Sequence, residues 1–307
     1  MGSSVLHGIK LMGILALLLC SSISLGATVG LLVEDNNLQV KQFQLQLSKL
    51  RPSDQFQLFT LQKLPKKNPS KEIKTWIAMG AKSLAVLLGR IDNTNTAQPA
   101  KILGLFVRPE AISKLTKLYP DSNFSLLDNT PPIARQLALI KVISAQLKTI
   151  AVLHSKQHPF DAVATAAVAQ KMGLTLITSE LSDPLNWERE SLRALKDADI
   201  ILGMNDTAIY NATTIRSILM RLYRASRPLI GPDKGYVRAG AVASTYSGVT
   251  ETIKAVAELL DANKVWPNII PNPHFNVVIN AQVARSLNIN VTDPELLSLK
   301  VREALSE

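Results

Sequence analysis

Residues 149–178 read T-I-A-V-L-H-S-K-Q-H-P-F-D-A-V-A-T-A-A-V-A-Q-K-M-G-L-T-L-I-T. Two apolar runs of strand length, Thr149–Leu153 and Leu174–Thr178, predict strands that are buried on both faces of a sheet. Between them, Phe160–Met172 has apolar residues at three- and four-residue spacing, which predicts an amphipathic helix. A strand, a helix and a second strand in this order predict neighbouring parallel strands joined by a crossover helix.

The same alternation extends along the chain in both directions. Further strands are expected at Thr28–Val33, Phe56–Leu61, Ser83–Leu88, Lys101–Val107, Asn123–Leu127, Ile200–Gly203, Pro228–Gly231 and Gly240–Thr245. Further helices are expected at Leu38–Leu50, Ser70–Met79, Pro109–Leu118, Ile133–Leu147, Trp187–Leu195 and Thr213–Arg224. Two successive blocks of this kind predict an α/β fold of two doubly wound parallel-sheet lobes.

The chain after Gly248 is too short for a third domain. It contains a predicted helix, a Pro-rich link, a strand and two short helices; the first three are Val249–Asn263, Trp266–Pro273 and Phe275–Ile279. We expect this tail to return and complete the two lobes. The predicted N-terminal lobe is then 27–130 plus 248–272, and the C-terminal lobe is 131–247 plus 273–307.

Residues 1–26 have the pattern of a cleaved secretory signal peptide. A weakly basic start is followed by the apolar stretch Leu11–Cys20 and then by small residues. Cleavage after Gly26 fits best, and cleavage after Ala27 is nearly as good. The apolar stretch is short for an uncleaved membrane anchor, and Leu17–Leu19 precede Cys20 where a lipoprotein anchor needs a small residue. The pattern therefore predicts that the chain is exported.

Composition and motifs exclude several function classes. The 307 residues carry 34 Lys plus Arg against 24 Asp plus Glu, a formal charge of +10, but no basic run exceeds Lys66-Lys67. That spread argues against nucleic acid as a partner. No Gly-rich phosphate or dinucleotide motif occurs, so no cofactor is expected. His154 and His158 straddle a strand end and a loop, so no metal site is expected. Without a nucleophile motif, or a thiol once Cys20 is removed, we predict that the chain is not an enzyme.

Ligands of open parallel sheets bind beyond the carboxyl ends of the strands. Several aromatic and polar side chains are expected at that edge, where an apolar cleft with a few polar groups can hold a small molecule. In the first lobe the candidates Glu34 and Asp35 follow the first strand. In the second lobe the candidates are Phe160, Asn205, Asp206, Thr207, Tyr210, Tyr236 and Tyr246. Asn205, Asp206 and Thr207 are equally suited to be helix caps.

Residues 227–247 read R-P-L-I-G-P-D-K-G-Y-V-R-A-G-A-V-A-S-T-Y-S and carry a family resemblance. The segment resembles the pattern I-P-[VL]-x-G-x-[DS]-x-x-x-V-x-x-G-A-[LV]-A-S of ABC-transporter substrate-binding proteins. Met204–Thr207 is similar to that family's polar D-N-T-like loop, and 278–287 resembles its V-x-N-x-x-x-A-x-x-L segment. The resemblance covers about residues 130–290.

The resemblance implies a type I periplasmic binding protein, a monomer of two lobes joined by three crossovers that closes on a small-molecule ligand and docks on an ABC permease. It implies ligand contacts from Phe160, Asp161, Asn205–Thr207 and Asp233. The family often has Asp-Pro where this chain has Arg108-Pro109, and Arg90 lies in a neighbouring loop. These two guanidinium groups favour an anionic or aromatic acid ligand. A sensor subunit that signals to a membrane kinase or receptor, and a scaffold without a transport role, remain alternatives.

Overall fold

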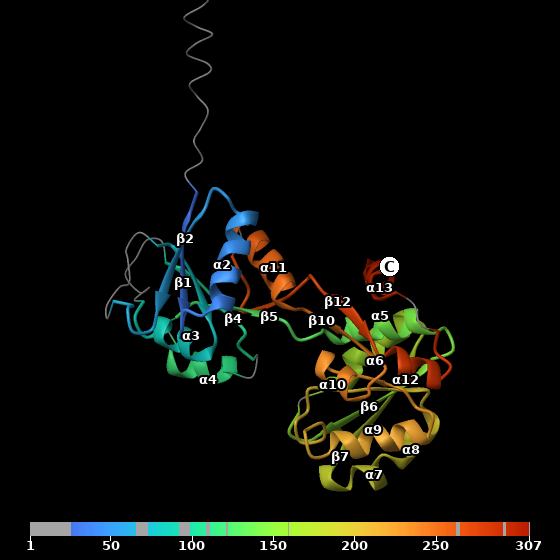
Figure 1. Cartoon of the computed structure of the whole chain (residues 1–307). Helices are drawn as coiled ribbons and strands as arrows, with labels where there is room; N and C mark the ends of the chain where they lie inside the picture. The colour runs from blue at the N-terminus through green and yellow to red at the C-terminus, as the bar shows by residue number, and fades with distance from the viewer. Residues whose placement is uncertain are drawn as a thin grey trace, which may run out of the picture. The chain divides into compact units, whose positions relative to one another are not determined.

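The structure is a computed structural model that describes residues 26–65, 73–91, 99–108, 111–120, 122–158, 160–261, 265–290 and 293–306. The described residues fall into two compact units, one within 1–104 and 113–124, the other within 105–112 and 125–307. The strands form two six-stranded sheets, and helices alternate with strands along the chain (Figure 1).

The first sheet has the strand order β11-β5-β4-β3-β1-β2. Its strands are β1 (Thr28–Val33), β2 (Gln55–Thr60), β3 (Thr75–Met79), β4 (Lys101–Leu105), β5 (Ser125–Asp128) and β11 (Ile269–Pro271). The helices among and after these strands are α2 (Leu38–Leu50), α3 (Ala81–Leu88), α4 (Ala111–Leu118) and α11 (Val249–Asp261). β1 pairs in parallel with β2 and β3, and β5 pairs in parallel with β11.

The second sheet has the strand order β12-β10-β9-β8-β6-β7. Its strands are β6 (Thr149–Ser155), β7 (Thr175–Leu181), β8 (Ile200–Leu202), β9 (Leu229–Ile230), β10 (Ala243–Tyr246) and β12 (Asn276–Ile279). The associated helices are α5 (Ile133–Ile143), α6 (Ala162–Lys171), the 3-10 helix η1 (Pro184–Asn186), α7 (Trp187–Glu190), α8 (Leu192–Asp197), α9 (Ile215–Arg224), α10 (Lys234–Ala239), α12 (Ala281–Ser286) and α13 (Pro294–Ser306). β10 and β12 pair antiparallel, whereas the other registered pairs of this sheet are parallel.

Alternate residues of the second sheet enter two different hydrophobic cores. Ile150 and Val152 of β6 belong to a cluster that includes residues of α5, α6 and α13. Ala151 and Leu153 belong to a second cluster that includes residues of α7, α9 and α10. Successive strand side chains point to opposite faces, so helices cover both faces of this sheet. This arrangement confirms the predicted doubly wound α/β fold.

The secondary structure predicted for residues 70–88 is wrong. Thr75–Met79 is strand β3 rather than part of a helix, and Ala81–Leu88 is helix α3 rather than a strand. β3 is buried beside β1, where the bulky Trp76 and Ile77 suit a two-sided environment. In α3 the residues Leu84, Leu87 and Leu88 are buried, so an amphipathic helix with a wide apolar face reads as a continuous apolar run.

Two elements in the last third of the chain also differ from the prediction. Helix α10 lies between β9 and β10, where the predicted strands followed one another directly. Asp233 begins it by accepting hydrogen bonds from two backbone N–H groups, and Gly240 ends it at a positive φ of 128°. The predicted Pro-rich link contains β11, whose Ile270 lies in register with Leu127 of β5. Short elements of two to six residues give little periodicity in a sequence.

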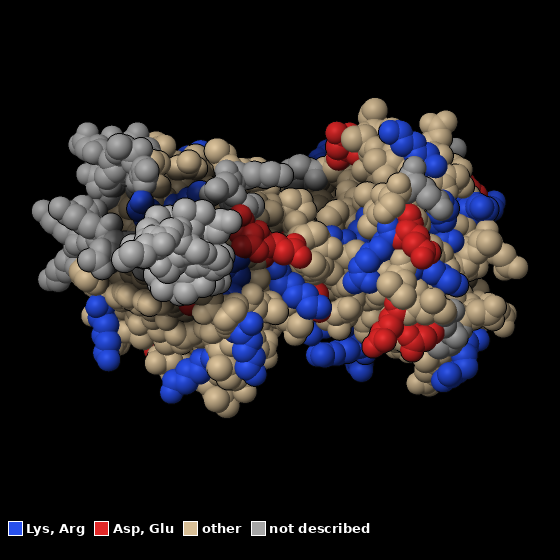
Figure 2. Space-filling view, turned by 90° about the horizontal axis from the view of Figure 1, so that it is seen from above, with Lys and Arg blue, Asp and Glu red and all other residues tan. Residues whose placement is uncertain are grey.

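Residues 1–25 of the predicted signal peptide 1–26 lie outside the described residues. In the described part of the chain, none of the helices combines the length and the apolar character needed to cross a membrane. On the face shown in Figure 2, basic and acidic side chains are interspersed with neutral ones.

Candidate functional site

A cavity of about 300 Å³ lies in the second compact unit, where three parallel strands end. The loops after β6, β8 and β9 contribute to it, together with the segment that joins β5 to α5 and the end of β11. Its lining residues are Asp128, Thr130, Pro131, Pro132, Ile133, Gln136, His158, Leu202, Gly203, Met204, Asn205, Pro232 and Pro271. This is the edge at which open α/β sheets bind ligands.

The backbone at the cavity depends on a glycine and on prolines. A Cβ atom at Gly203 would lie 3.0 Å from the carbonyl oxygen of Ile230 and 3.2 Å from Cδ of Pro232. Gly203 therefore lets the end of β8 approach β9 closely. Helix α5 starts after Pro131 and Pro132, and no side chain caps it. The N-terminus of α5, the positive end of the helix dipole, therefore lies at the segment that lines the cavity.

Four polar side chains of the lining have capacity for a ligand: Asp128, Thr130, His158 and Asn205. Asp128 Oδ1 accepts a hydrogen bond of 2.8 Å from the Thr130 backbone N–H, which fixes the turn before α5. Asn205 is exposed and His158 is partly exposed. With the apolar Ile133, they form a wall that suits a small molecule with both polar and apolar parts.

Gln136 lines the same cavity, but both polar atoms of its side chain are hydrogen-bonded within the protein. Its Nε2 donates to the carbonyl oxygen of Gly231 at 2.9 Å and to Ser244 Oγ at 3.2 Å. Its Oε1 accepts from the backbone N–H and from Oγ1 of Thr245, both at 3.1 Å. Gln136 is 3% exposed. It therefore joins α5 to the ends of β9 and β10 and holds the cavity wall in place.

Arg135 is buried beside these residues. Its Nη2 donates to the Asn272 carbonyl oxygen at 2.6 Å, and its guanidinium lies 4.3 Å from the ring centre of Phe275. Burial, followed by the nearby charge of Arg302, lowers the pKa of Arg135 to about 10, while the carboxylate of Asp128 opposes that shift. The guanidinium thus fixes α5 against the segment 272–275.

The predicted first-lobe residues Glu34, Asp35, Arg90 and Arg108 are not among the residues that line this cavity. Glu34 and Asp35 are exposed after β1 and line a separate cavity of about 340 Å³, in which Glu34 Oε2 lies 3.5 Å from Lys82 Nζ. Arg90 Nη1 donates to the carbonyl oxygens of Leu64 at 2.8 Å and Pro65 at 3.4 Å. The Arg90 guanidinium therefore binds the backbone of the segment that follows β2. Arg108 is exposed.

The three aspartates predicted to contact the ligand in the second lobe accept hydrogen bonds from backbone N–H groups. Asp161 Oδ1 accepts from the Ala164 N–H at 2.8 Å and caps α6. Asp233 Oδ1 caps α10, with its shortest bond, 2.6 Å, from the Gly235 N–H. Asp206 is 3% exposed, and its carboxylate binds the loop after β8 to the end of β6. Of the Asn205–Thr207 group, Asn205 lines the cavity, while Thr207 is exposed and does not line it.

The predicted aromatic residues also lie outside the lining. Tyr236 Oη donates to the Tyr210 carbonyl oxygen at 2.8 Å, and the ring of Tyr246 lies 5.1 Å from Lys234 Nζ. The Phe160 ring packs 5.1 Å from the ring of His154. Burial, followed by the charge of Asp233, raises the pKa of Tyr236.

Tyr210 is 1% exposed, and its Oη has no hydrogen-bond partner among the described residues. Burial, followed by Asp206 and Tyr236, raises the pKa of Tyr210. We expect Tyr210→Phe to increase the free energy of unfolding by about 1 kcal/mol, because an unsatisfied buried hydroxyl is removed. The unfolded chain releases this proton near pH 10, earlier than the folded chain, so the wild type loses stability above about pH 10.

Urea unfolding at pH 7 and at pH 10.5 tests this expectation. Tyr210→Phe should remove part of the alkaline loss, while the matched change of the 54% exposed Tyr223→Phe should alter neither value. A loss of stability in Tyr210→Phe at pH 7 would show that the Tyr210 hydroxyl has a hydrogen-bond partner and would contradict this expectation.

Sequence reasoning missed most of the lining. The loop after the fifth strand offered Asp128 and Thr130 as a signal, because polar residues follow a buried strand there. Gln136 and Arg135 directly precede the apolar residues 137–140 within the predicted helix, which is also a signal. His158 also follows a buried strand, whereas no comparable signal marks Pro232 or Pro271, since only the fold brings them to this cavity. In the described part of the chain, no group of three or more His, Cys, Asp or Glu side chains is placed to hold a metal ion.

Comparisons with known proteins agree with this architecture. The family model described as ABC transporter substrate binding protein matches residues 111–301. No curated protein sequence matches the chain. Among solved structures, the ligand-free, open form of a substrate binding protein with adhesive properties from Clostridium difficile is 14% identical, with a TM-score of 0.59, and covers 88% of this chain and 97% of its own.

Two other solved structures are similar at lower scores. An ABC domain in complex with L-Trp from Streptococcus pneumonia is 17% identical, covers 88% of this chain and 97% of its own, and has a TM-score of 0.49. A conserved domain protein from Vibrio cholerae is 19% identical, covers 90% and 98%, and has a TM-score of 0.48. The fold is that of type I periplasmic binding proteins. Because the family model matches more than half of its residues, the chain belongs to the family of ABC transporter substrate-binding proteins.

Proposed function

We propose that the chain captures a small molecule in the cavity at the ends of β6, β8 and β9 and delivers it to an ABC importer. The observation that carries this proposal is the cavity itself. It lies at the carboxyl edge of a parallel sheet, in a chain of a solute-binding, non-enzymatic family. Asn205, His158, Thr130 and Asp128 would supply hydrogen bonds, and Ile133 and Met204 apolar contact.

The lining also bears on the charge of the ligand. Asp128 and His158 are its titratable side chains, and neither Arg90 nor Arg108 belongs to it. The cavity by itself therefore gives no preference for an anion. A neutral ligand, or one with a hydrogen-bond donor toward Asp128, fits as well as the anionic or aromatic acid that the two arginines suggest.

The lobe boundaries and the location are part of the proposal. Lobes of 27–130 plus 248–272 and of 131–247 plus 273–307 are supported by β11, which joins β5, and by β12, which joins β10. Export to the periplasm by a cleaved leader is supported by the pattern of residues 1–26 and by family membership. Closure of the lobes on the ligand stays a prediction.

Thermal unfolding of residues 27–307 against a panel of small molecules tests this function. The panel includes amino acids, aromatic acids, amines, nucleobases and inorganic anions. A ligand at 100 times its Kd should stabilise the folded chain by about 2.7 kcal/mol, which raises the melting temperature measurably. If no compound in a broad panel shifts the melting temperature, the scaffold without a transport role becomes the better description.

A further inference from the structure

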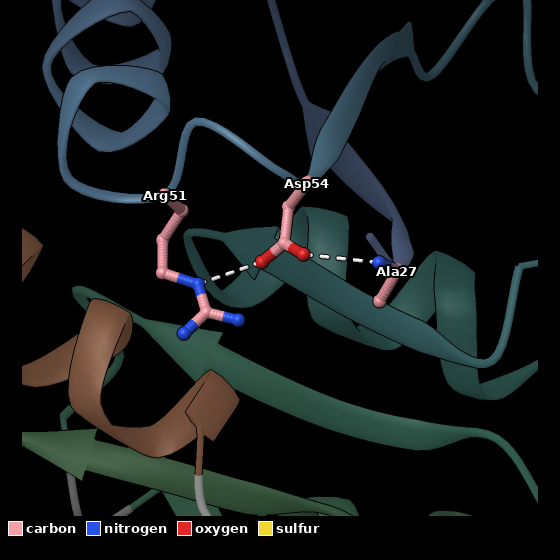
Figure 3. A network of polar contacts seen from close by, with 3 residues as sticks. All are labelled: Ala27, Arg51 and Asp54. Carbon is pink, nitrogen blue, oxygen red and sulfur yellow. Dashed lines mark hydrogen bonds and ion pairs between the residues drawn. The ribbon is translucent and has the colours of Figure 1, made fainter. Parts of the chain in front are cut away.

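The Asp54 side chain holds the backbone at Ala27, as Figure 3 shows. Its Oδ1 accepts a hydrogen bond of 2.9 Å from the backbone N–H of Ala27, and its Oδ2 accepts one of 2.7 Å from Nε of Arg51. The Asp54 side chain is 3% exposed and that of Arg51 is 15% exposed. Both carboxylate oxygens are therefore engaged, one by a guanidinium and the other by the chain at Ala27.

The turn that carries Asp54 is itself fixed by the backbone. The Asp54 N–H donates to the carbonyl oxygen of Arg51 at 3.1 Å, directly after helix α2. The next residue, Gln55, donates its N–H to the carbonyl oxygen of Ala27 at 3.0 Å. Ala27 is thus held at both its N–H and its carbonyl, so it belongs to the sheet although β1 is counted from Thr28.

At Gly26 the backbone packs closely against the backbone of Ser53. A Cβ atom at position 26 would lie 1.5 Å from the carbonyl oxygen of Ser53, so only glycine fits here. A small residue is also what a leader peptidase requires on the leader side of the bond that it cuts. The close packing at Gly26 and the leader pattern therefore both point to the bond between Gly26 and Ala27.

We propose that this bond is the processing site and that Asp54 is a preformed receptor for the new N-terminus. Water adds across the Gly26–Ala27 amide under catalysis by a leader peptidase, which leaves a carboxylate on Gly26 and an ammonium group on Ala27. The single neutral donor toward Asp54 then becomes a cation with three N–H donors. Charge-assisted hydrogen bonds are about twice as strong as neutral ones, and burial of the carboxylate limits screening by water.

The hydrogen bonds of Ala27 distinguish between the two cleavage positions that the sequence allows. A cut after Ala27 would remove both the bond to Asp54 and the bond to Gln55, and it would leave the buried carboxylate without a partner for Oδ1. A cut after Gly26 retains both bonds and strengthens one. This inference rests on the proposed export and is independent of ligand binding.

Two measurements test it. The first is the intact mass of the chain made with its own leader in a bacterial host and recovered from the periplasm, which should equal residues 27–307. The second is the melting temperature of two recombinant chains that begin at Ala27 and at Thr28. The Ala27 chain should melt at least about 2 °C higher, because a stabilisation of about 1 kcal/mol shifts the melting temperature by about this amount in a domain of this size.

Asp54→Asn should remove most of that difference, because the amide lacks the charge that the ammonium group meets. The matched variant Asp197→Asn changes an exposed carboxylate in the other unit and should leave the difference intact. A mature chain that begins at Thr28, or equal melting of the two recombinant chains, overturns the inference. A periplasmic chain that retains the leader overturns cleavage, and absence of the chain from the periplasm overturns export, whereas neither result affects the ligand-binding proposal.

Discussion

Gln136→Ala is expected to lower the free energy of unfolding by about 4 kcal/mol. The substitution removes four hydrogen bonds at one buried position and leaves the Gly231 carbonyl and the Thr245 N–H without their partners. Each buried group that loses its partner costs about 1–3 kcal/mol. The loss falls between α5 and the ends of β9 and β10, so the cavity should also lose its shape and its ligand affinity.

Urea unfolding of Gln136→Ala and of Gln170→Ala checks this expectation. Gln170 is an exposed glutamine near the end of α6, so its replacement should change the free energy of unfolding by less than about 0.5 kcal/mol. A loss below about 1 kcal/mol in Gln136→Ala would show that the amide is not the connection that its four contacts indicate.

Asp206→Ala is expected to lower the free energy of unfolding by about 3 kcal/mol. The carboxylate accepts from the Ser155 N–H at 2.6 Å, from Ser155 Oγ at 3.1 Å and from the Ala208 N–H at 3.1 Å. Hydrogen bonds to a charged group contribute about 1.5–3 kcal/mol, and the buried N–H of Ser155 would lose its acceptor. Asp206→Asn keeps one acceptor oxygen and should lose about half as much.

The same experiment separates a structural role of Asp206 from a ligand contact. In a structural role, stability falls in Asp206→Ala, while the exposed Asp197→Ala behaves like the wild type. An Asp206→Ala chain with unchanged stability but weakened ligand affinity would contradict the structure and restore Asp206 as a ligand residue.

Much of the fold can be predicted from the sequence because strand and helix periods are local. The unit of residues 149–178 is confirmed, since buried strands and an amphipathic helix have different spacings of apolar residues. The prediction for residues 70–88 fails because a helix with a wide apolar face and a strand buried on both faces both appear in the sequence as a continuous apolar run. Only the neighbouring strands decide between them.

Less of the site could be predicted, because acidic and polar residues at strand ends have two uses. Asp161 and Asp233 lie at the edge where ligands bind, yet each caps the helix that follows it. Asn205 is the one predicted residue that lines the cavity in the second unit. Pro232 follows β9 of the second sheet and Pro271 ends β11 of the first sheet. No short stretch of sequence records that both line one cavity.

The central claim is that the cavity beside Asn205 binds the ligand, and calorimetric titration of a compound found by thermal unfolding tests it most directly. Asn205→Trp places a large ring in the cavity at an exposed position, so the chain should stay folded and binding should be lost. Asn123→Trp makes the same change at an exposed position outside the lining and should bind one ligand per chain, like the wild type. Equal affinity in Asn205→Trp and the wild type would contradict the claim.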